Sequence, residues 1–319
     1  MNKSARIFVA GHRGLVGSAI VRCLEKRGFN RLIVRSHAEL DLTDQVSTRE
    51  FFRKEKPELV ILAAARVGGI NANSTLPAEF MDVNIAIQTN VIQESYRSNV
   101  EKLLFFGSSC IYPRDCLQPI REDYLLTGPL ELTNRSYALA KIAGIEMCWA
   151  YNRQYGTRYL AVMPANMYGP NDNYDLENSH VLPALIRRIH EAKDSGEKSF
   201  QAWGTGEAWR EFLYSDDLAE ACFSLLTTPE SHLDDLMRND QPPLINVGSG
   251  EELRVRDAVR AIVKVVGFKG KVNWDVTKPD GTPRKLLDST MMERFGWQPR
   301  VSLFDGLRLA YEDFLKRYS

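Results

Sequence analysis

A tyrosine and a lysine four residues apart could carry out acid–base chemistry in this chain of 319 residues. Tyr137 and Lys141 fall in the stretch from Ser136 to Tyr155, whose pattern predicts a helix, and their spacing places both on one helical face. A phenol with an ordinary pKa of about 10 is a poor acid–base group at neutral pH, but a neighbouring ammonium favours the phenolate. Because this spacing occurs often by chance on amphipathic helices, the pair needs a suitable setting to be catalytic.

Small polar residues that precede the pair supply such a setting. Ser108, Ser109 and Cys110 follow the apolar run KLLFFG, and ligands bind at the carboxyl ends of strands in parallel sheets. A free cysteine is usually a small buried hydrophobe, so the residues alone leave Cys110 open between that role and a reactive thiol.

A glycine-rich turn near the start of the chain could hold a phosphate. A strand-like run ends at Ala10, and Gly11, Gly14 and Gly17 follow at three-residue spacing where a helix is predicted to begin. Glycines let the backbone turn tightly beside a pyrophosphate, and a helix N-terminus presents free N–H groups to the anion. An ordinary strand-to-helix turn has a similar composition, but the position inside a β-α-β unit favours dinucleotide binding.

The second predicted strand ends without the acid that enzymes using NAD place on the ribose hydroxyl. Arg35 stands there, and Arg13 lies in the glycine loop. Two arginines could clamp a 2′-phosphate through charge-assisted hydrogen bonds, which predicts NADP(H), although both could also be solvated surface residues. Asp41 and the Leu42 backbone are placed to meet the adenine.

The elements that must position these residues alternate along the first half of the chain. Short apolar runs near 6–11, 31–36, 58–65, 102–109 and 159–166 are separated by helical stretches near 14–27, 47–55, 77–97 and 136–155. Apolar strands between helices predict an α/β fold with a Rossmann-type, doubly wound parallel sheet. We predict an NADP-binding domain over 1–167 with a returning segment at about 211–249. A smaller, interleaved C-terminal substrate lobe of loops and helices is predicted over 168–210 and 250–319.

Composition argues against several other classes. Lysine plus arginine and aspartate plus glutamate both number 41, and no basic cluster is interleaved with aromatics, so we expect no nucleic-acid partner. No long apolar stretch precedes the first strand, which favours a cytoplasmic protein that does not bind membranes. Five cysteines without a C-x-x-C motif indicate neither a disulfide framework nor a metal site.

The order of these motifs is specific. The sequence GxxGxxG, a strand-end serine, Tyr-x-x-x-Lys and then NMYGP at 166–170 resembles the extended short-chain dehydrogenase/reductase family of nucleotide-sugar enzymes over essentially the whole chain. The segments at 107–113, 169–173, 179–184 and 278–285 are similar to the members that act on GDP-4-keto-6-deoxy-D-mannose. The resemblance implies a bifunctional enzyme that performs 3,5-epimerisation and NADPH-dependent 4-reduction to give GDP-L-fucose.

That chemistry assigns expected roles to five residues. A C4 ketone acidifies the protons on C3 and C5, so epimerisation needs a base on one face of the sugar and an acid on the other. Cys110 and His180 fit these two roles, and their order at C3 and C5 stays open. In the reduction we expect Tyr137 to protonate the developing alkoxide while Ser108 holds the oxygen and Lys141 binds the ribose.

Binding roles also follow from the resemblance. Two arginines suit a diphosphate because planar guanidinium groups make bidentate contacts. His37 stands where relatives place an arginine toward the cofactor phosphate, so both cofactors could be accepted. A homodimer through a four-helix bundle, built from the helices near Thr89 and Tyr137, is expected. The expected cofactor residues are Gly11, His12, Arg13, Gly14, Leu15, Val16, Gly17, Arg35, His37, Asp41, Leu42, Ala64, Lys141, Pro164, Asn166, Met167 and His180, and the expected substrate residues are Ser108, Ser109, Cys110, Asn166, Arg188, Trp203, Arg210, Asp280 and Lys285.

Two other functions compete with this one. A nucleotide-sugar 4,6-dehydratase or 4-epimerase would retain NAD(P) through its cycle, but such enzymes typically carry threonine or alanine and an acid near the position of Cys110. A non-catalytic regulator that senses NADPH would commonly lack the tyrosine or the lysine, and both are present here.

Overall fold

A six-stranded parallel sheet forms the centre of the larger lobe in the computed structural model, which describes residues 1–176, 178–234, 236–237, 240–278 and 280–318. Its strand order is β2-β1-β3-β4-β5-β9, and every neighbouring pair is parallel. The strands are β1 (Ile7–Ala10), β2 (Leu32–Ile33), β3 (Leu59–Leu62), β4 (Lys102–Phe106), β5 (Tyr159–Pro164) and β9 (Leu244–Val247). All four residues of β1, β3 and β9 are buried, as expected for strands covered on both faces.

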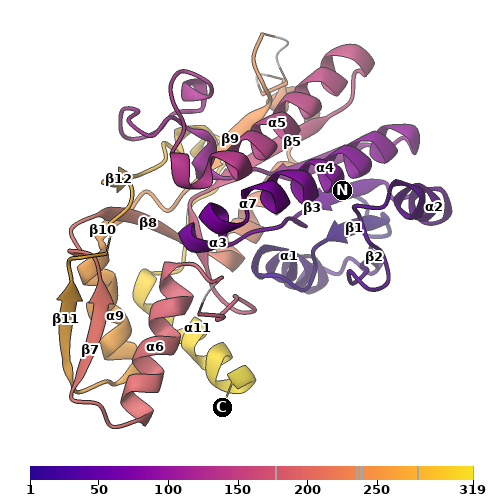
Figure 1. Cartoon of the computed structure of the whole chain (residues 1–319). Coiled ribbons are helices and arrows are strands. Elements are labelled where there is room, and N and C mark those ends of the chain that lie inside the picture. The colour runs from indigo at the N-terminus through magenta and orange to yellow at the C-terminus, as the bar shows by residue number, and fades with distance from the viewer. Residues whose placement is uncertain (177, 235, 238–239, 279, 319) are drawn as a thin grey trace.

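Helices cover both faces of this sheet, which confirms the predicted doubly wound fold (Figure 1). One layer packs α1 against α7, and the other packs α4 against α2 and α5. Their bounds are α1 (Leu15–Lys26), α2 (Gln45–Glu55), α4 (Pro77–Arg97), α5 (Arg135–Tyr155) and α7 (Ser215–Thr227), with the short helices α3 (Ile70–Thr75), α8 (Glu230–Leu233) and α10 (Thr290–Glu293) in the connections.

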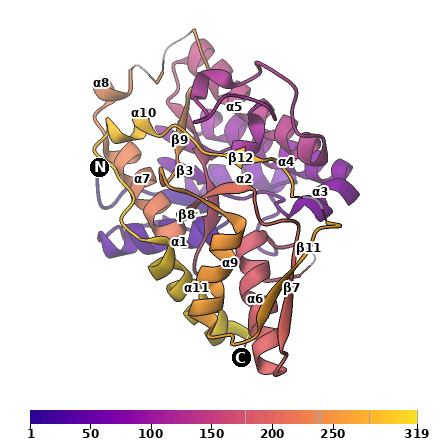
Figure 2. The same cartoon turned by 90° about the vertical axis from the view of Figure 1, so that its left-hand side faces the viewer.

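The smaller lobe contains strands where the sequence pattern predicts loops and helices (Figure 2). Strand β8 (Trp209–Tyr214) pairs with β6 (Asn166–Tyr168), β10 (Glu252–Arg254) and β12 (Arg284–Lys285), and β7 (Ser199–Trp203) pairs with β11 (Lys271–Asp275). The helices of this lobe are α6 (Val181–Asp194), α9 (Val255–Val266) and α11 (Leu303–Tyr318). These strands have two to six residues each and lack long apolar runs, so their pattern resembles that of loops.

Two hydrophobic clusters underlie the two lobes. The first surrounds the parallel sheet, and the second gathers aromatic residues such as Tyr168, Tyr174 and Phe314 between α6, α9 and α11. Leu287 and Trp297 pack with the first cluster, although they lie in the range assigned to the substrate lobe, and the domain boundaries themselves stay a prediction. None of the described helices is long and apolar enough to cross a membrane.

Candidate active site

Two of the three glycines in the turn after β1 are packed too tightly against the backbone to carry a side chain. Gly11 has φ +85°, and a Cβ added there would lie 2.7 Å from the backbone nitrogen of Ala64. A Cβ on Gly17 would lie 2.2 Å from the Gly11 oxygen. Gly14, in contrast, is exposed at the N-cap of α1, where no side chain caps the helix. The turn therefore leaves the open N-terminus of α1 as a cradle that fits a pyrophosphate.

Arg35 is engaged within the protein. Its guanidinium donates to the Glu55 carboxylate at 2.6 Å and to the Val34 carbonyl at 2.7 Å. Arg13 is exposed, and burial lowers the pKa of the neighbouring His12 with a further contribution from the charge of Arg13. A 2′-phosphate would thus meet Arg13 directly, and it would compete with Glu55 for Arg35.

The residues expected on the adenine side lie in a turn before α2. The Asp41 carboxylate accepts from the Thr43 backbone N–H at 2.9 Å and from its hydroxyl at 2.7 Å, and these bonds lower the pKa of Asp41. The exposed His37 ring lies 3.7 Å from that carboxylate. Asn90 on α4 donates its amide to the carbonyl of the buried Leu42 at 2.9 Å, which fixes the turn.

Tyr137 and Lys141 lie on α5, next to the carboxyl end of β4. The Lys141 ammonium is buried, donates to the Phe106 carbonyl at 2.8 Å and lies 5.8 Å from the centre of the Tyr137 ring. Burial lowers the pKa of Lys141 to about 7 and raises the pKa of Tyr137, which a hydrogen bond with Ser108 partly offsets. The Lys141 ammonium is expected to favour the Tyr137 phenolate. Burial opposes this effect, because it favours the neutral form of both groups.

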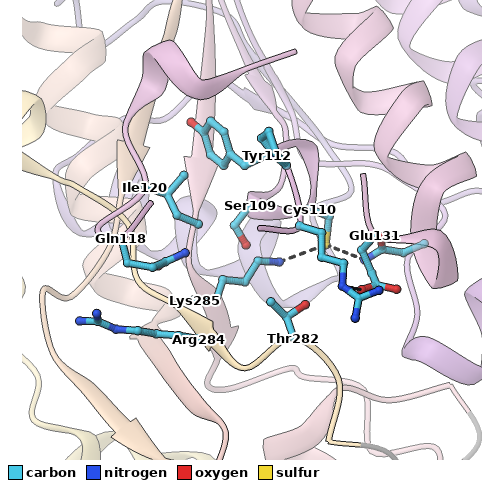
Figure 3. A pocket seen from close by; sticks show the side chains of 12 residues that line it. Ser109, Cys110, Tyr112, Gln118, Ile120, Glu131, Thr282, Arg284 and Lys285 are labelled. Atoms are coloured by element: carbon cyan, nitrogen blue, oxygen red, sulfur yellow. Dashed lines mark hydrogen bonds and ion pairs between the residues drawn. The ribbon is translucent and has the colours of Figure 1, made fainter. Parts of the chain in front are cut away.

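Cys110 lies in a cavity next to this pair (Figure 3). It follows Ser108, whose hydroxyl accepts from the Cys110 backbone N–H at 3.3 Å and so fixes the turn after β4. Its Sγ accepts from the Asn134 amide at 3.1 Å and from the Lys285 ammonium at 3.6 Å. Ser109 is buried and also lines the cavity.

His180 is exposed at the N-cap of α6, and the surrounding protein still lowers its pKa through desolvation. The preceding residues pack against the segment after β3, where the Gly69 N–H donates to the Asn178 carbonyl at 3.2 Å. A Cβ added to Gly68 in that segment would lie 3.1 Å from Phe80, whose ring packs edge-on against Tyr137 at 6.2 Å. Through these contacts, His180 is positioned at the same edge of the sheet as Tyr137.

A second group of predicted residues gathers around the β7–β8 turn in the smaller lobe. The Arg188 guanidinium lies 4.9 Å from the centre of the Trp203 ring, which is 59% exposed and so available for stacking. Arg210 donates to the Asp280 backbone carbonyl at 3.1 Å, and both Asp280 carboxylate oxygens accept from Thr205 at 2.7 Å. The Asp280 carboxylate is therefore already engaged within the protein, and its backbone carbonyl holds the Arg210 guanidinium.

Strand pairing links these two groups. On β12, Lys285 is the register partner of Arg210 on β8, so this strand pair connects Arg210 with the sulfur of Cys110. Lys285 and Cys110, both expected among the substrate residues, are 175 residues apart along the chain, and the structure brings the Lys285 ammonium to within 3.6 Å of the Cys110 sulfur.

The remaining predicted residues lie along the carboxyl edge of the sheet. Ala64 contacts the glycine turn, Pro164 ends β5, and Met167 on β6 packs against the core. Asn166 uses its amide on the Glu211 carbonyl at 2.9 Å. Sequence reasoning missed Asn134, because an asparagine directly before a helix is commonly a cap and attracts no other explanation.

Comparison with known proteins gives this arrangement a family. The model described as "NAD dependent epimerase/dehydratase family" matches residues 7–248. GDP-L-fucose synthase 1 of Arabidopsis thaliana is 56% identical, over 99% of this chain and 94% of that protein. Among solved structures, a GDP-6-OMe-4-keto-L-xylo-heptose reductase from C. jejuni has TM-score 0.93 and 36% identity, with 99% of each chain covered. A gdp-l-fucose synthetase from Naegleria fowleri bound to NADP has TM-score 0.88 and 26% identity over 100% of this chain and 95% of that one. The chain belongs to the NAD dependent epimerase/dehydratase family, in which its near relatives include GDP-L-fucose synthases.

Proposed function

We propose that this chain converts GDP-4-keto-6-deoxy-D-mannose to GDP-L-fucose by 3,5-epimerisation followed by 4-reduction. The observation that carries the proposal is the position of Cys110, a thiol beside the Ser108–Tyr137 pair with two hydrogen-bond donors on its sulfur. A reductase alone needs the tyrosine, whereas a thiol next to it adds a group that can remove a proton from carbon. The Arabidopsis thaliana relative carries the name of the enzyme that gives this product.

In the epimerisation, we assign Cys110 and His180 to the two faces of the sugar. The Cys110 thiolate accepts the proton from the carbon next to the ketone, and His180 exchanges the proton on the opposite face. Ser108 and Tyr137, joined by a hydrogen bond, donate toward the ketone oxygen and stabilise the enolate. Because the pKa of His180 is lowered, its imidazole is neutral in most molecules at pH 7. Only the smaller, protonated fraction can act as the acid.

In the reduction, the same oxygen receives a proton from Tyr137. NADP(H) is the cofactor and supplies the hydride to C4 when bound. Burial raises the pKa of Tyr137, which keeps the phenol protonated and able to donate. Lys141 lies between Tyr137 and the Phe106 carbonyl, from where its ammonium can reach the ribose. The glycine turn and Arg13 are the proposed contacts for the cofactor phosphates.

The GDP end of the substrate is assigned to the smaller lobe. Trp203 offers an exposed ring for base stacking, and Arg188 and Arg210 supply guanidinium groups for the diphosphate. Desolvation lowers the pKa of both arginines, so their positive charges are partly buried at a cost in free energy. The negative charge of a bound diphosphate would offset that cost.

Assembly and location complete the proposal. Helices α4 and α5 lie side by side, and their tyrosines Tyr96 and Tyr155 stack at 4.1 Å while 37% and 46% exposed. Exposed aromatics on two adjacent helices suit a four-helix interface with a second copy, which we propose as the homodimer. Five free cysteines fit a reducing compartment, and we place the enzyme in the cytoplasm.

One assay tests the reaction directly. The chain is incubated with GDP-4-keto-6-deoxy-D-mannose and NADPH, with loss of NADPH absorbance followed and the product stereochemistry determined by NMR. We expect stoichiometric NADPH consumption and a sugar inverted at C3 and C5. Consumption of NADPH without inversion would leave only a 4-reductase, and turnover without net consumption would indicate a 4-epimerase or dehydratase.

A further inference from the structure

The sulfur of Cys110 is contacted by side chains from two distant parts of the chain. Asn134, at the start of α5, donates its amide to Sγ at 3.1 Å. Lys285, on β12 of the smaller lobe, directs its ammonium to the same atom at 3.6 Å. Figure 3 shows the Lys285 side chain reaching toward the sulfur while Arg284, its neighbour in sequence, points the other way.

We propose that Lys285 and Asn134 are positioning residues for the epimerisation, in which Lys285 stabilises the Cys110 thiolate by its charge and Asn134 holds the sulfur in one orientation. A thiolate is the form that accepts a proton from carbon, and adjacent cations and N–H donors stabilise it. The role in epimerisation rests on the proposed function, whereas the stabilisation of the Cys110 thiolate by Lys285 is independent of which sugar the protein binds.

The charges around the site leave Lys285 as the cation for the sulfur. Arg284 donates to both carboxylate oxygens of Glu252, at 2.6 and 2.7 Å. Across the cavity, Arg114 lies 3.5 Å from the Glu131 carboxylate. None of the ion pairs among the described residues includes Lys285. Since both arginines already face carboxylates, Lys285 is the cation that contacts the Cys110 sulfur.

Two further titratable groups face this pair. Tyr137 on α5 senses Cys110, because a negative charge on the sulfur contributes to the raised pKa of the phenol. Cys116 follows in the same loop, and burial raises its pKa while the charge of Lys285 opposes that rise. Lys285 therefore acts on both thiols, but it is Cys110 that its ammonium contacts.

Among the described residues, the Asn134 side chain makes no hydrogen bond, apart from the one to Cys110, that would explain its position by the stability of the fold. Its amide oxygen is buried without a partner in the described part of the chain, and an unpaired buried acceptor costs about 1–3 kcal/mol. The amide nitrogen is nevertheless directed to the sulfur. Because Asn134 is the N-cap residue of α5 and Tyr137 lies in its first turn, one helix end fixes the sulfur and the phenol relative to each other.

Alkylation of Cys110 tests the proposal without any sugar. Iodoacetamide reacts with thiolates, so the rate at Cys110, measured by mass spectrometry of its peptide over a pH series, reports the thiolate fraction. We expect Lys285→Met to move the midpoint upward by about one pH unit, which is about tenfold slower alkylation near neutral pH. Lys285→Arg should restore most of the rate, and Arg284→Met, the matched loss of a neighbouring charge, should leave it unchanged. Equal rates for wild type and Lys285→Met would overturn the proposal.

Exchange of the C3 and C5 protons in heavy water tests the catalytic consequence. With GDP-4-keto-6-deoxy-D-mannose, Lys285→Met and Asn134→Ala should lower the rate constant for exchange at saturating sugar with little change in KM. A raised KM with unchanged alkylation would make Lys285 a substrate-binding residue only and overturn the proposal. If wild type shows no exchange while alkylation still depends on Lys285, the proposed function fails and the sulfur–lysine relation stands. Lys285→Gln replaces Lys285→Met if the latter does not bind NADPH.

Discussion

Tyr137 holds its proton more firmly than an isolated tyrosine does, and this sets what the residue can do. Burial raises the pKa of its phenol, while burial lowers the pKa of Lys141 to about 7. At neutral pH the phenol is therefore protonated while Lys141 is only partly charged, which suits Tyr137 to giving a proton to a developing alkoxide. This is the role expected in reduction. An acceptor role would require the Lys141 charge to be restored by a bound ligand.

Removing the phenol oxygen should separate catalysis from binding. In Tyr137→Phe the ring can keep its edge-on contact with Phe80, so the fold and the affinity for NADPH should be preserved. The rate of NADPH oxidation should fall by about 10²–10⁴ because the proton donor is lost. Single-turnover absorbance measures this rate, and fluorescence titration measures NADPH affinity. Tyr151→Phe, on the same helix but with its ring packed against Tyr155 at 5.5 Å, is the control. A Tyr137→Phe enzyme of full activity would contradict the assignment.

At the scale of elements, the fold follows from the sequence wherever a segment is long and periodic. Helix α4 spans Pro77–Arg97 as predicted, because proline starts the helix and apolar positions repeat through it. Strands β7, β10 and β12 were not predicted, since two to five residues without an apolar run give no signal apart from their partners. The Arg35–Glu55 pair was missed for a related reason: it forms only when α2 packs beside β2.

The same limit applied to the site. Tyr137 and Lys141 could be predicted because both lie on one helix, where spacing fixes direction. The contact between Lys285 and Cys110 could not, because strand β12 has to pair with β8 before the ammonium reaches the sulfur.

The glycine turn gives a prediction that belongs to one element. Gly17→Ala places a Cβ 2.2 Å from the Gly11 oxygen, so the backbone must shift, and we expect a loss of about 1–3 kcal/mol of stability. Gly14→Ala meets nothing closer than 3.5 Å and should change stability by less than about 1 kcal/mol. It should still weaken NADPH binding, because the methyl group stands at the open N-terminus of α1. Urea unfolding and NADPH titration measure the two effects, and wild-type affinity in Gly14→Ala would exclude this turn as the pyrophosphate site.

At the scale of the whole molecule, β8 joins the two lobes and the candidate site. It pairs with β6, which follows the parallel sheet, and with β12, which carries Lys285 to Cys110. The segment from β6 to α6 then runs back to the sheet edge with His180. Because the proposed substrate and cofactor residues come from both lobes, we expect the stability of the smaller lobe to control whether the site is assembled.

Asp172 in that connecting segment makes this stability depend on pH. Its carboxyl is buried, one oxygen accepts from the Asn173 N–H at 2.8 Å, and the other has no partner among the described residues. Burial raises its pKa to about 7 from an ordinary 3.8. The folded state therefore holds this proton more tightly than the unfolded chain does. The resulting stabilisation is full below pH 3.8 and is lost as the pH rises to about 7.

Asp172→Asn imitates the protonated carboxyl and should remove this dependence. Relative to wild type, the variant should gain stability as the pH rises from about 4 to about 7, by up to about 4 kcal/mol, and no further above that range. Asp44→Asn is the control of opposite sign. Asp44 accepts from the N–H groups of Val46 and Ser47 at the start of α2, which lowers its pKa, so its contribution is lost only as the pH falls. Urea unfolding over a pH series measures both differences. A difference between wild type and Asp172→Asn that is constant with pH would show that Asp172 is ionised in the folded protein throughout, with its charge satisfied by Arg317, which donates to the Asp172 backbone carbonyl at 3.0 Å.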